Sequence, residues 1–259
     1  MRDLLLRLNQ SMISAGRRDR EHFDVGAFHL MQLAGSDRPW TNFAVPVKES
    51  SSPAEVCQMV QAFRSRGKTP RVELLEPLWP DVNRLLLSEG FLAEMRLPLM
   101  ICDRPVIAKN SSARPVSTQD EMIQVAMIEA EAFGHPFEVD QSAVNRRLER
   151  IRGGNLVAAL LRHDGEPASS AMLTIEGDVM ELVSVATRPK FRGRGLARQA
   201  CELLLAHAFG TGEPLVWLSA TAPKLYASLG FVPIGHQVNL TLPFTQENFS
   251  PSICGNIAK

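Results

Sequence analysis

A basic loop with two glycines marks the second half of the chain as a place for anion chemistry. Glycine permits positive φ and leaves the backbone uncovered, so several N–H groups can turn toward one anion. A helical pattern follows the loop, and the first turn of a helix adds unpaired N–H donors and positive dipole charge. We therefore expect the loop to bind a phosphate or pyrophosphate group. The loop residues are Arg192, Gly193, Arg194, Gly195, Leu196 and Ala197.

The segments around the loop predict a mixed sheet flanked by helices. Before the loop, apolar runs are joined by Asp-Gly and Gly-Asp turn signals, which indicates an antiparallel meander. After it, strand and helix patterns alternate. We expect strands at 156–161, 169–175, 179–187, 215–219 and 236–242, and helices at 120–133, 141–151, 196–209 and 223–229.

Two other phosphate-binding patterns do not fit these surroundings. A dinucleotide fold requires a parallel strand-helix-strand unit and an acidic residue that holds a ribose, whereas the strands before this loop are joined by hairpins. The lysine followed by Ser or Thr of a Walker A loop is also missing. A basic loop without any ligand stays open as an alternative.

The loop and a later segment together resemble the GNAT N-acetyltransferase superfamily. Arg192, Gly195 and Ala197 fill the three fixed positions of that family's acetyl-CoA motif, Q/R-x-x-G-x-G/A. Residues 224–231 read Lys-Leu-Tyr-Ala-Ser-Leu-Gly-Phe and resemble its L-Y-x-x-L-G-F signature. The likeness covers residues 113–242. It implies a fold that contains both helices and strands (α/β in the broad sense, α+β in the strict sense), with a mixed, largely antiparallel sheet flanked by helices.

The resemblance implies a role for each matched residue. The loop amides would hold the coenzyme A pyrophosphate, and Tyr226 would protonate the departing thiolate. Ser219 stands seven residues before this tyrosine, where many members have asparagine, and is expected beside the coenzyme. The backbone of the strand before the loop would pair with the pantetheine arm as an added strand does. The strand residues concerned are Val183, Ser184 and Val185.

Glu181 is our candidate for the base that frees the attacking amine. Strict alternation along the strand places Glu181 on the same face as Val183 and Val185, toward the expected cleft. The alternative is that Glu181 is a solvated or ion-paired carboxylate with no catalytic role.

The first half of the chain repeats the order strand, helix, strand, helix, Gly-Phe, strand, with Gly90-Phe91 corresponding to Gly230-Phe231. Its segment at the position of the phosphate loop, residues 48–53, has no glycine and carries an acid. We therefore expect two tandem units: a degenerate GNAT-like domain without a coenzyme loop at 1–105, a linker at 106–112, and a GNAT domain at 113–259.

Composition limits the partners. The 259 residues include 28 basic and 28 acidic ones, so no net charge draws the protein to nucleic acid or to an anionic membrane.

No membrane span, secretory signal or metal-ligand spacing is present, and a cytoplasmic location is expected. We expect acetyl transfer from acetyl-CoA to an amine of a small molecule or peptide, without a metal. The alternative is a coenzyme A-binding sensor or scaffold without turnover. The oligomeric state is left open.

Overall fold

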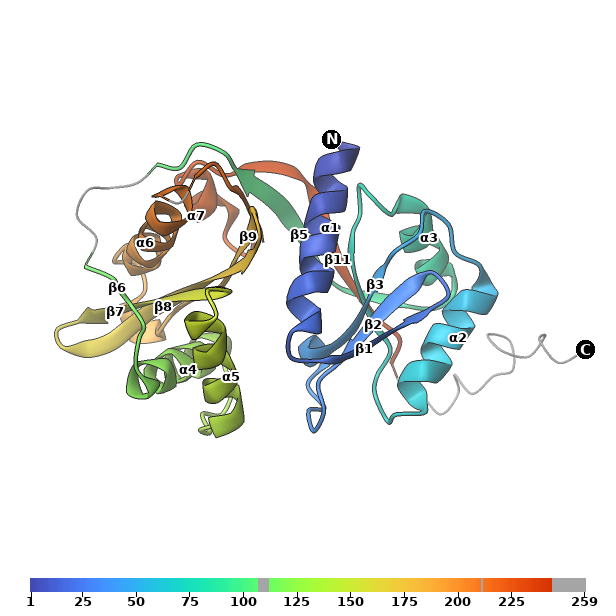
Figure 1. Cartoon of the computed structure of the whole chain (residues 1–259), viewed down its shortest axis with the longest axis horizontal. Helices are drawn as coiled ribbons and strands as arrows, with labels where there is room; N and C mark the ends of the chain where they lie inside the picture. The colour runs from blue at the N-terminus through green and yellow to red at the C-terminus, as the bar shows by residue number, and fades with distance from the viewer. Residues whose placement is uncertain (107–111, 211, 244–259) are drawn as a thin grey trace, which may run out of the picture. The chain divides into compact units, whose positions relative to one another are not determined.

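The structure, a computed structural model, describes residues 1–106, 112–210 and 212–243. Its contacts divide the chain into two compact units (Figure 1). The first unit comprises Met1–Leu99 and Ile234–Lys259, and the second unit comprises Met100–Pro233. The strands form an 11-stranded sheet in the order β1-β2-β3-β4-β11-β5-β10-β9-β8-β7-β6. The predicted fold, a mixed and largely antiparallel sheet with flanking helices, is confirmed.

In the first unit, helices accompany short strands. Its elements are α1 (Arg2–Arg17), β1 (Glu21–Val25), β2 (Phe28–Gln32), η1 (Pro39–Thr41), β3 (Asn42–Pro46), α2 (Pro53–Arg64), β4 (Arg71–Leu75) and α3 (Pro80–Ser88). Strands β1, β2 and β3 form an antiparallel hairpin series that the sequence patterns did not predict in full. At the start of α2, Ser52 and Glu55 form a capping box, so the chain itself satisfies the helix N-terminus.

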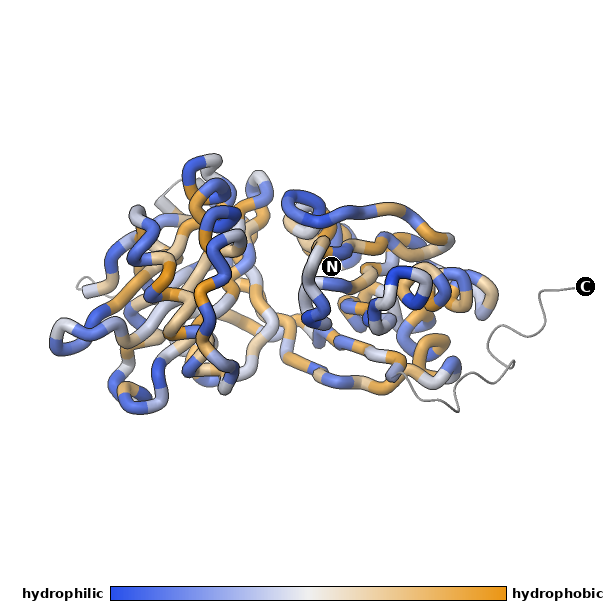
Figure 2. Tube along the Cα trace, turned by 90° about the horizontal axis from the view of Figure 1, so that it is seen from below, coloured by the Kyte–Doolittle hydropathy of each residue, from blue (hydrophilic) through white to orange (hydrophobic). Residues whose placement is uncertain are grey.

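The second unit contains the predicted meander and the elements that follow it. Its helices and strands are β6 (Arg114–Pro115), α4 (Gln119–Phe133), α5 (Gln141–Arg152), β7 (Leu156–His163), β8 (Glu166–Glu176), β9 (Val179–Thr187), η2 (Pro189–Phe191), α6 (Leu196–Gly210), β10 (Leu215–Ser219) and α7 (Pro223–Ala227). Strands β7, β8 and β9 pair antiparallel, and β10 pairs parallel with β9. In Figure 2 hydrophobic and hydrophilic residues alternate along the trace, and several of the outermost turns are hydrophilic.

Two strands, β5 (Leu92–Cys102) and β11 (Val232–Thr241), lie at the ends of the two compact units. Strand β11 pairs with β4 of the first half, and β5 lies between β11 and β10. The two compact units differ from the predicted division at residues 105 and 113, because most of β11 belongs to the first unit and Met100 to Cys102 belong to the second. The predicted domains stay a prediction. Each half contributes its last strand to the pairing of the other. Most of the predicted linker, residues 107–111, lies outside the described residues.

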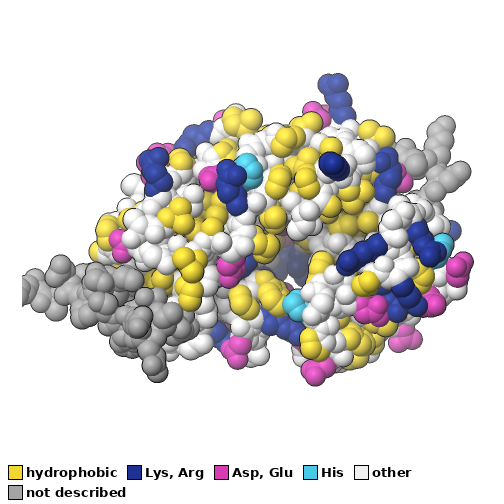
Figure 3. Space-filling model, turned by 180° about the vertical axis from the view of Figure 1, so that it is seen from behind, with side chains coloured by type: hydrophobic (Ala, Val, Ile, Leu, Met, Phe, Trp, Pro, Cys, Tyr) yellow, Lys and Arg dark blue, Asp and Glu magenta, His cyan; other side chains and the backbone are white. Residues whose placement is uncertain are grey.

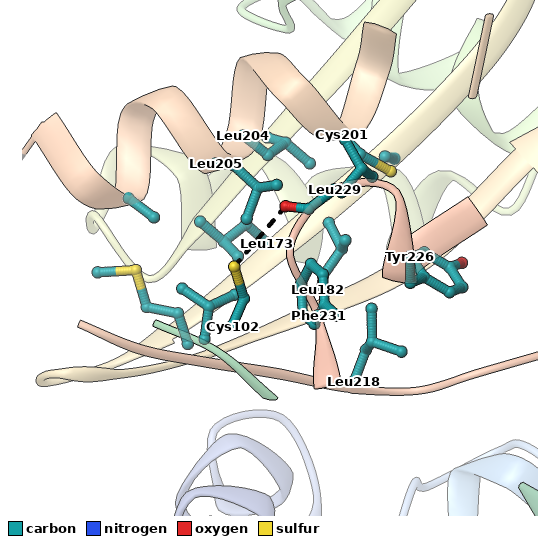
Figure 4. Close-up of a cluster of buried hydrophobic side chains, with 14 of the residues drawn as sticks. Cys102, Leu173, Leu182, Cys201, Leu204, Leu205, Leu218, Tyr226, Leu229 and Phe231 are labelled. Carbon is teal, nitrogen blue, oxygen red and sulfur yellow. Dashed lines mark hydrogen bonds between the residues drawn. The ribbon is translucent and has the colours of Figure 1, made fainter. Parts of the chain in front are cut away.

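The second unit has a hydrophobic core on each face of its strands. On one face, α4 packs through Met122, Val125 and Ile128 over β7, β8 and β9, and α5 packs through Val144 and Leu148. On the other face, α6 and α7 pack over the same strands and over the end of β5 (Figure 4). There Cys102 of β5 lies 3.9 Å from the carbonyl oxygen of Leu229 as a weak S–H donor. The tip of β5 therefore completes the core that surrounds α7.

The described surface carries no extended single-sign field on the face shown in Figure 3, where basic and acidic side chains are interspersed. Among the described residues, no helix is long and apolar enough to cross a membrane. In the same residues, no group of three or more His, Cys, Asp or Glu side chains is placed to hold a metal ion.

Candidate functional site

Strand β9 has a free backbone edge directly before the basic loop. On one side it pairs with β8 from Val179 to Thr187. On the other side it pairs with β10 only from Val179 to Glu181, where Leu215 to Trp217 are its partners. The edge of β9 beyond Glu181 has no partner from β10 in the described pairing. Its backbone N–H and C=O groups are thus available to an extended ligand.

A β-bulge at Ser184 interrupts β9 within this free edge. Ser184 has φ of 53°, and the register between β8 and β9 shifts beside it. A positive φ at a non-glycine residue costs about 1–3 kcal/mol, and such strain gathers at functional sites. The bulge also corrects one expectation. Val183 packs on the α4 side of the sheet, whereas Val185 packs on the α6 side. The two valines do not share a face, because the extra residue reverses the alternation.

The basic loop presents a run of unpaired backbone N–H groups. Gly193 and Gly195 have φ of 78° and 72°, and a Cβ atom built on either would have no neighbour within 4 Å. The N–H of Arg192 donates to Pro189 and that of Gln199 donates to Gly195. Among the described residues, no acceptor is paired with the N–H groups from Gly193 to Arg198. Glycines with positive φ and unpaired N–H groups at the start of a helix form the kind of backbone arrangement that binds anions, so the loop is our candidate anion site.

The basic side chains of the loop are largely engaged by the protein. The Arg192 guanidinium donates to the carbonyl oxygens of Ala132 (2.9 Å) and Thr187 (3.3 Å). It therefore ties the loop to the end of α4 and to the end of β9. Arg194 lies 2.7 Å from the Nε2 atom of His163. The backbone N–H groups, more than free arginine charge, are therefore what the loop offers to an anion.

Side chains next to the loop tie it to β8, to α4 and to the core. Lys190 donates to the Glu166 carboxylate at 2.5 Å and lies over the Phe191 ring. Arg188 pairs with Glu131 of α4 at 2.8 Å. Leu196, the first residue of α6, is buried in a small cluster with Phe191. Its contribution to a bound anion is consequently limited to its backbone N–H.

Tyr226 lies on α7 at the edge of the α6-side core. Its side chain is buried, and its ring packs edge-on against Phe231 with a centroid distance of 6.0 Å. Figure 4 shows its hydroxyl oxygen directed away from the labelled leucines and Phe231. Burial raises the pKa of this hydroxyl above its ordinary value, and nearby Cys201 raises it further. The hydroxyl therefore keeps its proton at neutral pH and can donate it.

Comparison with known proteins assigns a family to this segment. Residues 122–231 match the model of the Acetyltransferase (GNAT) family. They form a GNAT acetyltransferase domain. The match includes the free edge of β9, the loop and Tyr226. It stops before β11, most of which belongs to the first unit.

Solved structures share the fold over most of the chain. A GCN5-related N-acetyltransferase from Kribbella flavida is 24% identical, with a TM-score of 0.76 over 93% of this chain and 96% of that chain. One from Sphaerobacter thermophilus is 16% identical, with a TM-score of 0.60 over 83% and 76%. A tandem GNAT protein from the clavulanic acid biosynthesis pathway is 16% identical, with a TM-score of 0.56 over 85% and 80%. No curated protein matches the chain significantly.

Within the GNAT domain, the two remaining predicted site residues occupy different surroundings. Ser219 ends β10 and is half-buried. Glu181 is also half-buried, and its parallel register with Trp217 places both on the α4 face of the sheet. Val183 shares this face. The structure thus places Glu181 on the face opposite the core that holds Tyr226, and its role as base stays a prediction.

Sequence reasoning missed three features of the GNAT domain. The bulge at Ser184 has no glycine or proline to signal it. The tip of β5 comes from the other half of the chain, so no pattern near Tyr226 could reveal it. Arg198, which reads as one more positive charge beside the phosphate loop, instead pairs with Glu202 and Ser228.

Proposed function

We propose that the GNAT domain transfers an acetyl group from acetyl-CoA to an amine. The observation that supports this most is that three features occur together in the GNAT domain. These are the unpaired N–H groups of the loop, the bulged edge of β9 that β10 leaves unpaired, and the protonated hydroxyl of Tyr226. These features match the pyrophosphate, the pantetheine arm and the thioester sulfur of acetyl-CoA in turn.

The loop fits a pyrophosphate on its own geometry. Two glycines with positive φ leave space where side chains would stand, and the amides that follow lack acceptors among the described residues. The dipole of α6, a helix of 15 residues, adds positive potential at the same point. Gly193 to Ala197 would hold the phosphates, while Arg192 shapes the loop from behind.

We propose direct transfer without an acyl-enzyme. The amine nitrogen attacks the thioester carbonyl carbon, the C–N bond forms, and the C–S bond then breaks. An N–H group at the β9 bulge would stabilise the oxyanion, and the Tyr226 hydroxyl would give its proton to the leaving sulfur. The amine proton would pass to Glu181, directly or through water, or to solvent. Val183, Ser184 and Val185 would hold the pantetheine arm through their backbone, and Ser219 would lie beside it.

We propose a small-molecule amine or a peptide as the acceptor. The formal net charge is zero, and basic and acidic side chains are interspersed on the face shown in Figure 3, so neither observation favours nucleic acid, an anionic membrane or a strongly cationic acceptor. Cytoplasmic acetyl-CoA as the donor is part of the same proposal.

We also propose that the first unit is a GNAT-like unit that has lost its coenzyme site. At the position of the phosphate loop, the Ser52 side chain accepts from the Glu55 N–H, and the Glu55 carboxylate reaches back to the Ser52 N–H. The Glu55 carboxylate thus already occupies the N-terminus of α2. A phosphate there would meet a carboxylate instead of unpaired amides.

A coupled assay tests the proposal. The purified protein is supplied with acetyl-CoA and a panel of amines, and release of free thiol is followed together with the mass of the acetylated product. We expect turnover with at least one amine, and a drop of roughly 10²-fold or more in kcat for Tyr226→Phe. Full activity of Tyr226→Phe would remove the acid role. Saturable binding of acetyl-CoA without turnover on any amine would favour the sensor or scaffold.

A further inference from the structure

Arg198 connects the helix of the phosphate loop to the helix of Tyr226. It lies in the first turn of α6, and its side chain points along α6 toward α7 instead of into the loop. Its Nε atom donates to the Glu202 carboxylate at 2.8 Å, one turn further along α6. Its second arm donates to the Ser228 hydroxyl at 2.7 Å. Ser228 is the residue after α7, two positions beyond Tyr226.

The Glu202 end of this pairing lies in the core, whereas the hydrogen bond from Arg198 to Ser228 lies at the exposed end of α7. The Glu202 side chain is only 1% exposed, and the Arg198 side chain is 34% exposed. A buried carboxylate needs a compensating partner, so Glu202 holds the guanidinium in place. The planar guanidinium can then serve a second acceptor in a defined direction. Ser228 accepts from Arg198 while its own hydroxyl donates to Leu225 at 2.6 Å.

Helix α7 needs such support because it is short. It spans Pro223–Ala227, only five residues, and a single helical turn is unstable by itself. Core packing of Tyr226 against Phe231 restrains one side of the turn. The Arg198–Ser228 hydrogen bond restrains the end of the same turn from α6. A rotation of this turn would move the Tyr226 hydroxyl directly.

We propose that Arg198 is a positioning residue for the reaction: clamped by Glu202, it holds the Ser228 turn so that Tyr226 stays aligned with a coenzyme bound at the start of α6. The inference rests on the proposed function, since it gives Arg198 a part in the step assigned to Tyr226. It also removes Arg198 from the set of phosphate ligands. The same helix that binds the pyrophosphate thereby sets the position of the acid.

Ser228→Ala is the sharpest variant, because it deletes the acceptor of Arg198 and leaves the buried charge pair intact. Ser88→Ala is the matched control. Ser88 is an exposed serine at the end of α3 whose hydroxyl donates to Leu85 at 2.8 Å, as that of Ser228 donates to Leu225. Arg198→Lys keeps the charge beside Glu202 but loses the second arm, so it should resemble Ser228→Ala.

A readout independent of turnover uses the fact that Tyr226 is the only tyrosine of the chain. Tyrosine labelled with ¹³C at Cζ therefore gives one resonance from the intact protein. We expect this resonance to move in Ser228→Ala and in Arg198→Lys and to stay in place in Ser88→Ala. An unmoved resonance in Ser228→Ala would overturn the proposal, whatever the activity of the protein.

Kinetics then separate positioning from a general loss of structure. We expect Ser228→Ala to lower kcat roughly tenfold and to change the KM for acetyl-CoA less than about twofold, because alignment is lost and binding is kept. In a Tyr226→Phe background, Ser228→Ala should have no further effect. An equal, additive loss in that background would refute the positioning role and leave the function standing. Unchanged turnover in Tyr226→Phe alone would instead refute the acid role.

Discussion

A single charge placed in the phosphate loop gives the most direct test of the site. Gly195→Asp puts a carboxylate at a residue with φ of 72° and no neighbour within 4 Å of its Cβ position. Gly177→Asp is the matched control, since Gly177 has φ of 65°, an equally open Cβ position and a place in the turn between β8 and β9. The left-handed conformation costs a side chain about 1–2 kcal/mol at either position. Without ligand, the two variants should therefore lose similar stability.

The ligand separates the two variants. A carboxylate about 5 Å from one phosphate charge is repelled by roughly 3 kcal/mol at an effective dielectric constant of about 20, or about a hundredfold in Kd. Acetyl-CoA at about 100 times the wild-type Kd stabilises the wild type by about 2.7 kcal/mol, whereas a hundredfold weaker Kd leaves only about 0.4 kcal/mol. At about 2–4 °C per kcal/mol, these values correspond to rises in Tm of about 5–10 °C and about 1 °C.

Thermal unfolding with and without acetyl-CoA measures this difference. We expect wild type and Gly177→Asp to show the full rise in Tm, and Gly195→Asp to lose most of it. Equal rises in both variants would place the coenzyme away from the loop. Absence of any rise in the wild type, with the protein folded, would remove coenzyme binding itself and would leave the enzyme and the sensor without support.

Three further predictions concern the frame of the site. Burial raises the pKa of the Cys201 thiol from 9.0 to about 12, so its contribution to folding stability is present below pH 9 and is lost as pH rises toward 12. In urea titrations at alkaline pH, the free energy of unfolding of Cys201→Ala should therefore fall less steeply with pH than that of the wild type, by about one proton, and an unchanged slope would contradict the assignment. At the bulge, Ser184→Val should lower the free energy of unfolding by roughly 1–3 kcal/mol, whereas Ser184→Gly should stay within about 1 kcal/mol of wild type. Denaturation curves that show the same effect for both variants would mean that the bulge is not strained. A Cβ at Gly230 would lie 2.3 Å from the Arg104 carbonyl oxygen, so Gly230→Ala should cost about 2–4 kcal/mol, and a wild-type Tm would disprove this packing.

Local pattern was sufficient for most elements of the GNAT domain. The predicted strand at 179–187 and the predicted strand at 215–219 coincide with β9 and β10, and the predicted helix at 196–209 is one residue short of α6. These segments follow from side-chain periodicity and from glycine and proline at their ends, which act within a few residues. The loop's likeness to a coenzyme motif is local in the same sense, because successive backbone amides build the site.

Tertiary structure decided the remaining features, each of which depends on contacts between distant residues. Pairing of β11 with β4 and of β5 with β10 is not encoded in either strand alone, since any apolar strand can complete a sheet. The bulge at Ser184 separates the faces of Val183 and Val185, and one inserted residue is enough to reverse a period of two.

Arg198 illustrates the same limit for charge. In the sequence it is a fourth positive charge near Lys190, Arg192 and Arg194. In the folded chain, the buried Glu202 carboxylate directs it away from the loop and toward Ser228. The sequence by itself determined which residues could bind an anion and donate a proton. Only the fold determined which strand edge stays free, which way each side chain faces and what holds Tyr226, because these depend on partners far apart in the chain.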